Sequence, residues 1–125
     1  MSEAEFPSEF LSVMARMGAR PDLVDASKGH VRVNENLTSH GIIRVAPLML
    51  LADTVVGMRL ESLVEDWTFT TDFSFRRAEI TEAQNIEASS TILRHGRRLM
   101  VEELEYVNES NCSVGHAQIT FMRTP

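Results

Sequence analysis

Residues 45–60, VAPLMLLADTVVGMRL, constrain the fold more than any other stretch of the sequence. They are apolar on nearly every helical face and show little polar surface before Arg59, whereas a helix at a protein surface carries a polar face opposite its apolar one. Pro47 suits the start of a helix, because the amide that proline lacks would have no intrahelical partner there. The stretch is too short and too interrupted by polar residues to span a bilayer. It therefore predicts a core helix around which the rest of the chain folds.

A single acid, Asp53, lies near the middle of this helix. Burying a lone carboxylate costs free energy unless it is hydrogen-bonded, neutralised or turned toward a cleft where its charge is useful. Asp53 is therefore the first candidate for chemistry. The alternative is a buried structural acid bonded to Thr54, to a backbone amide or to a partner subunit.

Length and composition favour one cytoplasmic domain over residues 1–125. The chain is 43% apolar, which is enough for a single packed core. Its net charge is -6, Lys28 is its only lysine, and no basic patch indicates nucleic-acid binding. Cys112 is the only cysteine, which excludes an intramolecular disulfide, and the first residues lack the features of a signal peptide.

The first third of the chain predicts a helix, a strand and a loop. Four apolar residues follow the polar start at helical spacing, and they are Phe10, Leu11, Met14 and Met17. Gly18 and Pro21 supply the stop, so residues 1–22 are expected to form a helical lid over one edge of the core. Residues 23–34 favour a strand with a bend or bulge at Gly29. Residues 34–41 indicate a polar loop that ends at Gly41.

Four strands are expected after the core helix. Residues 67–75 alternate between an aromatic face and a polar face, and the aromatic face should pack on the helix. Residues 85–93, 99–107 and 113–122 are the other three, joined by turns around Gly96 and over residues 108–111. Antiparallel strands after one apolar helix predict an α+β fold in which a curved antiparallel sheet wraps around one long buried helix.

Three segments together resemble the hotdog-fold thioesterases, and in particular the phenylacetate-degradation (PaaI-like) acyl-CoA thioesterases. They are GIIRVAPLMLLADTVVG over residues 41–57, TTDFSFRR over residues 70–77 and HGRRLMVEELEYVN over residues 95–108. The resemblance implies a hotdog fold and a thioester hydrolase. It also implies a homodimer, or a dimer of dimers, whose active site forms between two subunits. Independently, a small sheet with free edges gains from pairing with a second copy.

The loop before the helix departs from the pattern of that family. The family usually has His-Gly-Gly at a fixed spacing before the catalytic acid, and this spacing places Arg44, Val45 and Ala46 on the motif. His40 and Gly41 look like the first two letters of the motif but lie too far from Asp53, and only a local shift would bring His40 into the cleft.

The resemblance implies roles for several residues. Asp53 would act as general base or nucleophile, and the amides of Val45 and Ala46 would bind the oxyanion. Arg44 would add a cation, and Thr70 would border the acyl pocket of the partner subunit. The alternative for Thr70 is a plain polar strand face.

Coenzyme A would be part of the substrate of such an enzyme. No other cofactor and no metal are expected. Arg94, Arg97 and Arg98 would clamp the phosphates of coenzyme A, and the alternative is a solvated turn. The histidines have no spacing typical of metal ligands.

The leading hypothesis is an acyl-CoA thioesterase that uses Asp53. A second hypothesis is a hotdog protein that binds an acyl-CoA or another acyl ligand without hydrolysing it. A hotdog hydratase or dehydratase is a weaker third, because no aspartate and histidine lie a few residues apart in the loop and helix. Neither a nucleic acid nor a membrane is expected as a partner.

Overall fold

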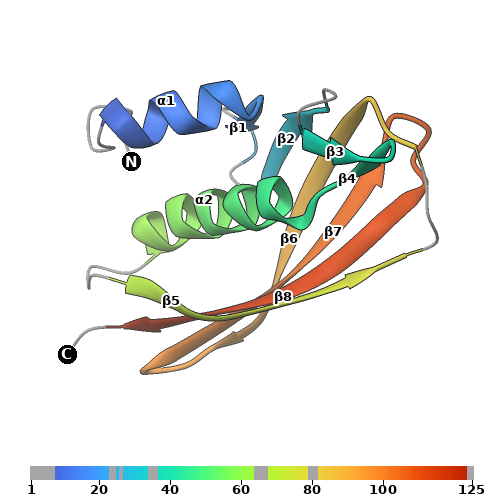
Figure 1. The fold of residues 1–125 in the computed structure, drawn as a ribbon. Coiled ribbons are helices and arrows are strands. Elements are labelled where there is room, and N and C mark those ends of the chain that lie inside the picture. Colours follow the sequence, from blue (N-terminus) through green and yellow to red (C-terminus); the bar gives the residue numbers. More distant parts are fainter. Residues whose placement is uncertain are drawn as a thin grey trace.

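The apolar stretch forms the long helix α2 (Val45–Leu63), and an antiparallel sheet curves around it (Figure 1). The computed structural model describes residues 8–22, 25, 27–33, 37–63, 68–78 and 82–123. In chain order the other elements are α1 (Ser8–Arg16), β1 (Ala19–Pro21), β2 (Lys28–Arg32), β3 (Thr38–Ser39), β4 (Ile42–Ile43), β5 (Thr68–Arg77), β6 (Asn85–His95), β7 (Leu99–Asn108) and β8 (Ser113–Arg123).

The main sheet has six strands in the order β1-β2-β6-β7-β8-β5, and every neighbouring pair is antiparallel. Its inner face packs on α2, whose Leu48, Leu51 and Val55 are completely buried. The strands supply alternate buried side chains to this core, as Leu104 and Tyr106 do in β7. The predicted α+β architecture, a curved sheet around one buried helix, is therefore confirmed.

The N-terminal helix ends as the sequence predicts. Gly18 adopts a left-handed conformation with φ of 64°, which glycine tolerates and which commonly ends a helix. Met14 is buried, and its sulfur accepts a hydrogen bond from the hydroxyl of Thr54 on α2, at an oxygen–sulfur distance of 3.8 Å. Thus α1 covers one side of α2. Residues 1–7 of the predicted lid lie outside the described part of the chain.

The sheet begins earlier than the sequence indicates. β1 pairs with β2, and it was not predicted because it is very short and contains proline. The strand expected over residues 23–34 occupies only Lys28–Arg32 among the described residues, and residues 23, 24, 26 and 34 lie outside them. The loop expected over residues 34–41 contains β3, which forms a small hairpin with β4 directly after the loop. Its turn is formed by His40 and Gly41, with φ of 54° and 80°, a type I′ signature.

Gly29 makes neither a bend nor a bulge, so that prediction is wrong. It pairs in regular register with Pro21 and with Ala88. A Cβ atom at this position would lie only 2.8 Å from the Cδ1 atom of Leu51. Glycine is present because β2 approaches α2 too closely for a side chain.

The predicted aromatic face of residues 67–75 is split by a bulge in β5. Thr70 pairs with Phe121 and Asp72 pairs with Thr120, so Thr71 is an extra residue without an opposite partner. One extra residue reverses the alternation of side chains. Phe73 and Phe75 therefore pack on the core, while Phe69 points to the outer face and is 37% exposed. Residue 67 lies outside the described residues.

The three C-terminal strands agree with the sequence in place and order, and each extends one or two residues further than predicted. The turns around Gly96 and over residues 108–111 both join adjacent antiparallel strands. In the second turn Asn111 has φ of 62°, a conformation that asparagine tolerates better than most residues.

Candidate active site

One stripe of α2 is not covered by the chain's own sheet. It consists of Val45, Met49, Asp53 and Gly57, which are spaced four residues apart and so share one helical face. Val45 is 38% exposed and Met49 is 44% exposed, and Asp53 is partly exposed. We refer to these four residues as the uncovered stripe. Asp53 is thus an acid at an open helix face and not an enclosed core acid.

The carboxylate of Asp53 accepts a hydrogen bond from the hydroxyl of Thr70 on β5. The β5 bulge turns Thr70 toward α2, because it places this side chain on the same face as the buried Phe121. The predicted placement of Thr70 opposite the core-facing aromatic side chains is therefore wrong. Thr54, which the alternative interpretation paired with Asp53, instead donates to the carbonyl of Leu50 at 2.8 Å.

The start of α2 is bonded to the preceding loop and to the sheet. The amide of Arg44 donates to the carbonyl of Leu37 at 2.8 Å, and the hydroxyl of Tyr106 donates to the carbonyl of Leu48 at 2.7 Å. Burial raises the pKa of Tyr106 far above its ordinary value, so the hydroxyl keeps its proton. Val45 and Ala46 lie exposed in the first turn, where backbone amides have no intrahelical acceptor and the helix dipole favours negative charge.

Asp53 and the first-turn amides do not meet within one chain. Val45 and Asp53 are about two helical turns apart, which corresponds to roughly 12 Å along the axis. A single thioester carbonyl cannot contact both groups at that separation. The same chain therefore presents the acid and the first-turn amides at two separate points of α2.

The three arginines predicted to bind coenzyme A lie together at the β6–β7 turn and are all exposed. A cross-strand row on the inner face links this turn to Thr70, and it runs through His95, Met100, Phe121 and Thr70. Three strand spacings of about 4.8 Å each separate the ends of the row, or roughly 14 Å. The arginine cluster thus lies at the same end of the sheet as Thr70, but it does not contact Asp53.

Three solved structures illustrate what the chain is similar to. The PaaI protein of the phenylacetic acid degradation operon of E. coli is 16% identical, with a TM-score of 0.78, and the match covers 91% of this chain and 85% of that one. A mutant thioesterase from Pseudomonas aeruginosa is 13% identical, with a TM-score of 0.81, covering 97% and 96%. A Bacillus halodurans protein solved with CoA is 11% identical, with a TM-score of 0.79, covering 96% and 78%. No protein-family model and no curated protein matches the sequence.

The first two of these matches cover more than nine tenths of this chain at high structural similarity. This chain has the hotdog fold. The fold implied by the sequence resemblance is confirmed, and α2 is the central helix of the hotdog. The similarity lies in the backbone more than in the sequence. The chemistry of this hotdog chain must therefore be argued from its own side chains.

Sequence reasoning missed a polar cluster on the inner face of the hotdog sheet. Arg59 of α2 donates from Nη1 to the Oγ of Ser90 at 2.8 Å and to Oε1 of Glu102 at 3.2 Å. Glu102 is only 1% exposed, and its Oε2 has no hydrogen-bond partner in the described structure. Desolvation raises the pKa of Glu102, and the charge of Arg59 opposes that shift. The signal in the sequence was the alternation of β7, which places Glu102 on the buried face with Leu104.

The described ranges of the chain support neither a metal site nor a membrane-spanning helix. There, His, Cys, Asp and Glu side chains do not gather in groups of three or more that could hold a metal ion. Over the same ranges, neither helix combines the length and the apolar character that crossing a membrane requires.

Proposed function

We propose that this protein is an acyl-CoA thioesterase, which hydrolyses an acyl-CoA to a free acid and coenzyme A. The observation that carries the proposal is the carboxylate of Asp53, held by Thr70 on a helix face that the chain itself leaves uncovered. The names of similar structures support it, since one is a thioesterase and another was solved with CoA.

In the proposed reaction, Asp53 takes a proton from water as the water oxygen adds to the thioester carbonyl. Alternatively, the carboxylate adds directly, and water later hydrolyses the resulting anhydride. The first-turn amides of Val45 and Ala46 stabilise the negative carbonyl oxygen. The carbon–sulfur bond then breaks, and the thiolate of coenzyme A leaves and is protonated. Thr70 orients the carboxylate, and Arg44 adds positive charge beside the helix start.

The proposed site requires two copies of the chain. Because the acid and the amides are roughly 12 Å apart on one helix, two antiparallel α2 helices related by a twofold axis would bring Asp53 of one copy toward Val45 of the other. The uncovered stripe supports this arrangement, since it exposes Met49 between the two groups. The ten-residue strand β5 is an edge of the sheet and can pair with a second β5. The protein is therefore proposed to act as a homodimer, or as a dimer of dimers.

Coenzyme A is proposed to enter only as part of the substrate. Its phosphates would contact Arg94, Arg97 and Arg98 at the β6–β7 turn, where the side chains are exposed and close together in sequence. Arginine matches phosphate geometry through two parallel hydrogen bonds. The proposed hydrolysis otherwise uses water and groups of the protein itself, which are the carboxylate of Asp53, the first-turn amides, Thr70 and Arg44.

Thiol release from short, medium, long and aromatic acyl-CoAs tests the proposal. We expect turnover by the parent protein, and a fall in kcat of at least about a hundredfold in Asp53→Asn, because a positioned base is lost. Thr70→Val should reduce kcat by about tenfold, because hydrogen bonds to charged groups contribute about 1.5–3 kcal/mol. Thr71→Val, at the neighbouring bulge position, is the matched control and should retain the parent kcat.

Two results would contradict this assignment. Turnover that is unchanged in Asp53→Asn would remove Asp53 from the mechanism. The absence of turnover with every acyl-CoA, together with stabilisation of the protein by acyl-CoA on heating, would instead support a hotdog protein that binds an acyl ligand without hydrolysing it.

A further inference from the structure

The outer face of the sheet carries a groove that the proposed hydrolysis does not use. Gly29 and Val31 of β2 point toward α2, so Lys28, His30 and Arg32 point to the opposite, outer face. The groove crosses β1, β2, β6 and the end of β7, and its volume is about 610 Å³. Ligand pockets usually measure roughly 300–1,000 Å³. We call it the outer groove.

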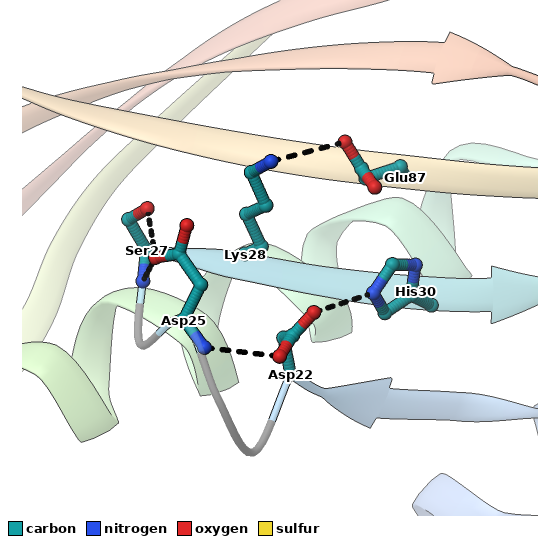
Figure 2. Close-up of polar contacts among 6 residues, drawn as sticks. All are labelled: Asp22, Asp25, Ser27, Lys28, His30 and Glu87. Carbon is teal, nitrogen blue, oxygen red and sulfur yellow. Dashed lines mark hydrogen bonds and ion pairs between the residues drawn. The ribbon is translucent and has the colours of Figure 1, made fainter.

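The acids of the outer groove already have partners. Glu87 forms an ion pair with Lys28, at 3.8 Å between Oε1 and Nζ, and Figure 2 shows this pair beside the contact between His30 and Asp22. Glu109 accepts hydrogen bonds from the amides of Gln84 and Asn85 at 3.1–3.2 Å. Its pKa is lowered by backbone hydrogen bonds, including those from these two residues, so Glu109 is held as a carboxylate that caps the start of β6.

The histidine of the outer groove also has a carboxylate partner. The Nε2 atom of His30 lies 3.2 Å from Oδ2 of Asp22, and the other carboxylate oxygen of Asp22 accepts a hydrogen bond from the amide of Asp25 at 3.0 Å (Figure 2). His30 and Asp22 are both partly buried. This pair fixes the imidazole against the groove and balances any charge that it carries.

Two arginines of the outer groove lack such a carboxylate partner among the described residues. Arg20 and Arg32 line the groove, and across the described ranges neither guanidinium lies within 4.0 Å of a carboxylate. Arg20 is directly opposite His30, and Arg32 lies two residues further along β2. Such diagonal neighbours are about 7–8 Å apart, within reach of long side chains, so both guanidiniums can converge on one anion.

Glycine keeps the groove open beside Arg32. The carbonyl of Gly18 accepts the amide of Arg32 at 3.1 Å, so Gly18 lies next to Arg32 at the sheet edge. A Cβ atom at Gly18 would lie 2.9 Å from the carbonyl oxygen of Arg32. The left-handed φ of 64° at Gly18 also disfavours a side chain. No side chain from this position therefore crowds the guanidinium of Arg32.

We propose that the outer groove binds a small phosphorylated molecule through Arg20 and Arg32. Paired guanidiniums form bidentate hydrogen bonds with phosphate oxygens and are weakly hydrated, which suits them to this class of ligand. The groove lies on the opposite face of the sheet from Asp53. It also lies near the β1 edge, whereas Asp53 contacts the β5 edge. The site is therefore separate from the proposed thioesterase site and does not rest on that function.

Calorimetric titration with pyrophosphate tests the site, with inorganic phosphate and sulfate compared at the same ionic strength. We expect pyrophosphate to bind more tightly than sulfate, and the double variant Arg20→Gln/Arg32→Gln to weaken pyrophosphate binding at least tenfold. The matched control Arg76→Gln/Arg77→Gln removes two exposed arginines from β5, at the other edge of the sheet, and should leave this affinity unchanged. Far-UV circular dichroism and thermal melting check that both variants remain folded.

Amide NMR shifts locate the binding without using turnover. Pyrophosphate should move the amide signals of Gly18 and His30 and leave that of Asp53 in place. Equal affinity for sulfate and pyrophosphate, or unchanged binding by Arg20→Gln/Arg32→Gln, would overturn the site. Loss of binding in Arg94→Gln/Arg97→Gln, with binding intact in Arg20→Gln/Arg32→Gln, would assign the anion to the β6–β7 turn and would also overturn it.

Discussion

At the scale of single residues, Thr70 shows how a small backbone irregularity can create a site contact. Thr71 is the extra residue of the β5 bulge, and without it the side chain of Thr70 would point to the outer face. With it, the Thr70 hydroxyl meets the carboxylate of Asp53 across the gap between sheet and helix. Bulges are frequent next to active sites because they re-aim a side chain in this way.

Glu102 is a second residue whose surroundings have a measurable consequence. Its carboxylate is buried, with one oxygen bonded to Arg59 and the other without a hydrogen-bond partner in the described structure. Desolvation raises its pKa in the folded protein above the value in the unfolded chain. The folded state therefore binds this proton more tightly, and Glu102 lowers stability as pH rises from about 4.3 through the folded pKa.

We expect Arg59→Met to destabilise the protein by about 3 kcal/mol at neutral pH, because it leaves a buried carboxylate without its cation. The loss should be smaller near pH 5, where more of the Glu102 carboxyl is protonated. The double variant Arg59→Met/Glu102→Gln should recover most of the stability and abolish this extra pH dependence. Urea unfolding between pH 5 and pH 8 measures these differences, and an equal loss at both pH values would contradict the assigned role of Glu102.

At the scale of elements, the position of α2 depends on how closely the sheet approaches it. Gly29 lets β2 lie against Leu51 and Val55, and Tyr106 of β7 bonds to the carbonyl of Leu48 in the helix. These two contacts fix α2 against strands on either side of β6. The helix start carries the amides proposed to bind the oxyanion. The same contacts therefore hold these amides in place.

Two glycine substitutions test this packing and should have opposite signs. Gly29→Ala should destabilise the protein by about 1–3 kcal/mol, because its methyl group would collide with Leu51 and overpack the core. Gly57→Ala is the matched control within α2, where a Cβ atom meets nothing within 4 Å, and it should stabilise the protein by about 1 kcal/mol through helix propensity. Urea denaturation gives both values. A neutral Gly29→Ala would show that β2 can move away from α2 at no cost.

At the scale of the whole molecule, two features are incomplete in a single chain. The uncovered stripe of α2 exposes the large apolar side chains of Val45 and Met49, and β5 presents a long free edge. Both features lie on the side of the sheet where Asp53 contacts Thr70. A second copy that covers the stripe would bury apolar area and would also complete the proposed site.

Met49→Glu should dissociate the proposed dimer, because it places like charges near the twofold axis and removes apolar contact area. Val13→Glu is the control, since Val13 on α1 is also 44% exposed but is not part of the stripe. Sedimentation equilibrium should show a dissociation constant at least tenfold higher for Met49→Glu and unchanged for Val13→Glu. Thiol release should fall with dimer content. A parent protein that sediments as a monomer would refute the two-copy site.

Much of the fold could be predicted because local patterns set it. A long apolar run with one acid favours a core helix, and alternating strands joined by short turns favour an antiparallel sheet that covers it. The C-terminal strands agree with that prediction because their alternation and turn residues point to the same structure. Asp53 was likewise singled out from the sequence as a candidate, since a lone acid in an apolar helix is conspicuous.

The contacts that define the candidate site depend on tertiary structure. The β5 bulge, and with it the hydrogen bond between Thr70 and Asp53, arises from the register between β5 and β8. The roles of Gly29 and Glu102 depend on which segments lie against them, and no local pattern encodes those distances. Sequence alone thus predicted the core helix and the three C-terminal strands and singled out Asp53 as a candidate, because periodicity is local. Only the packed sheet decided which side chains meet, because register and close approach involve residues far apart in the chain.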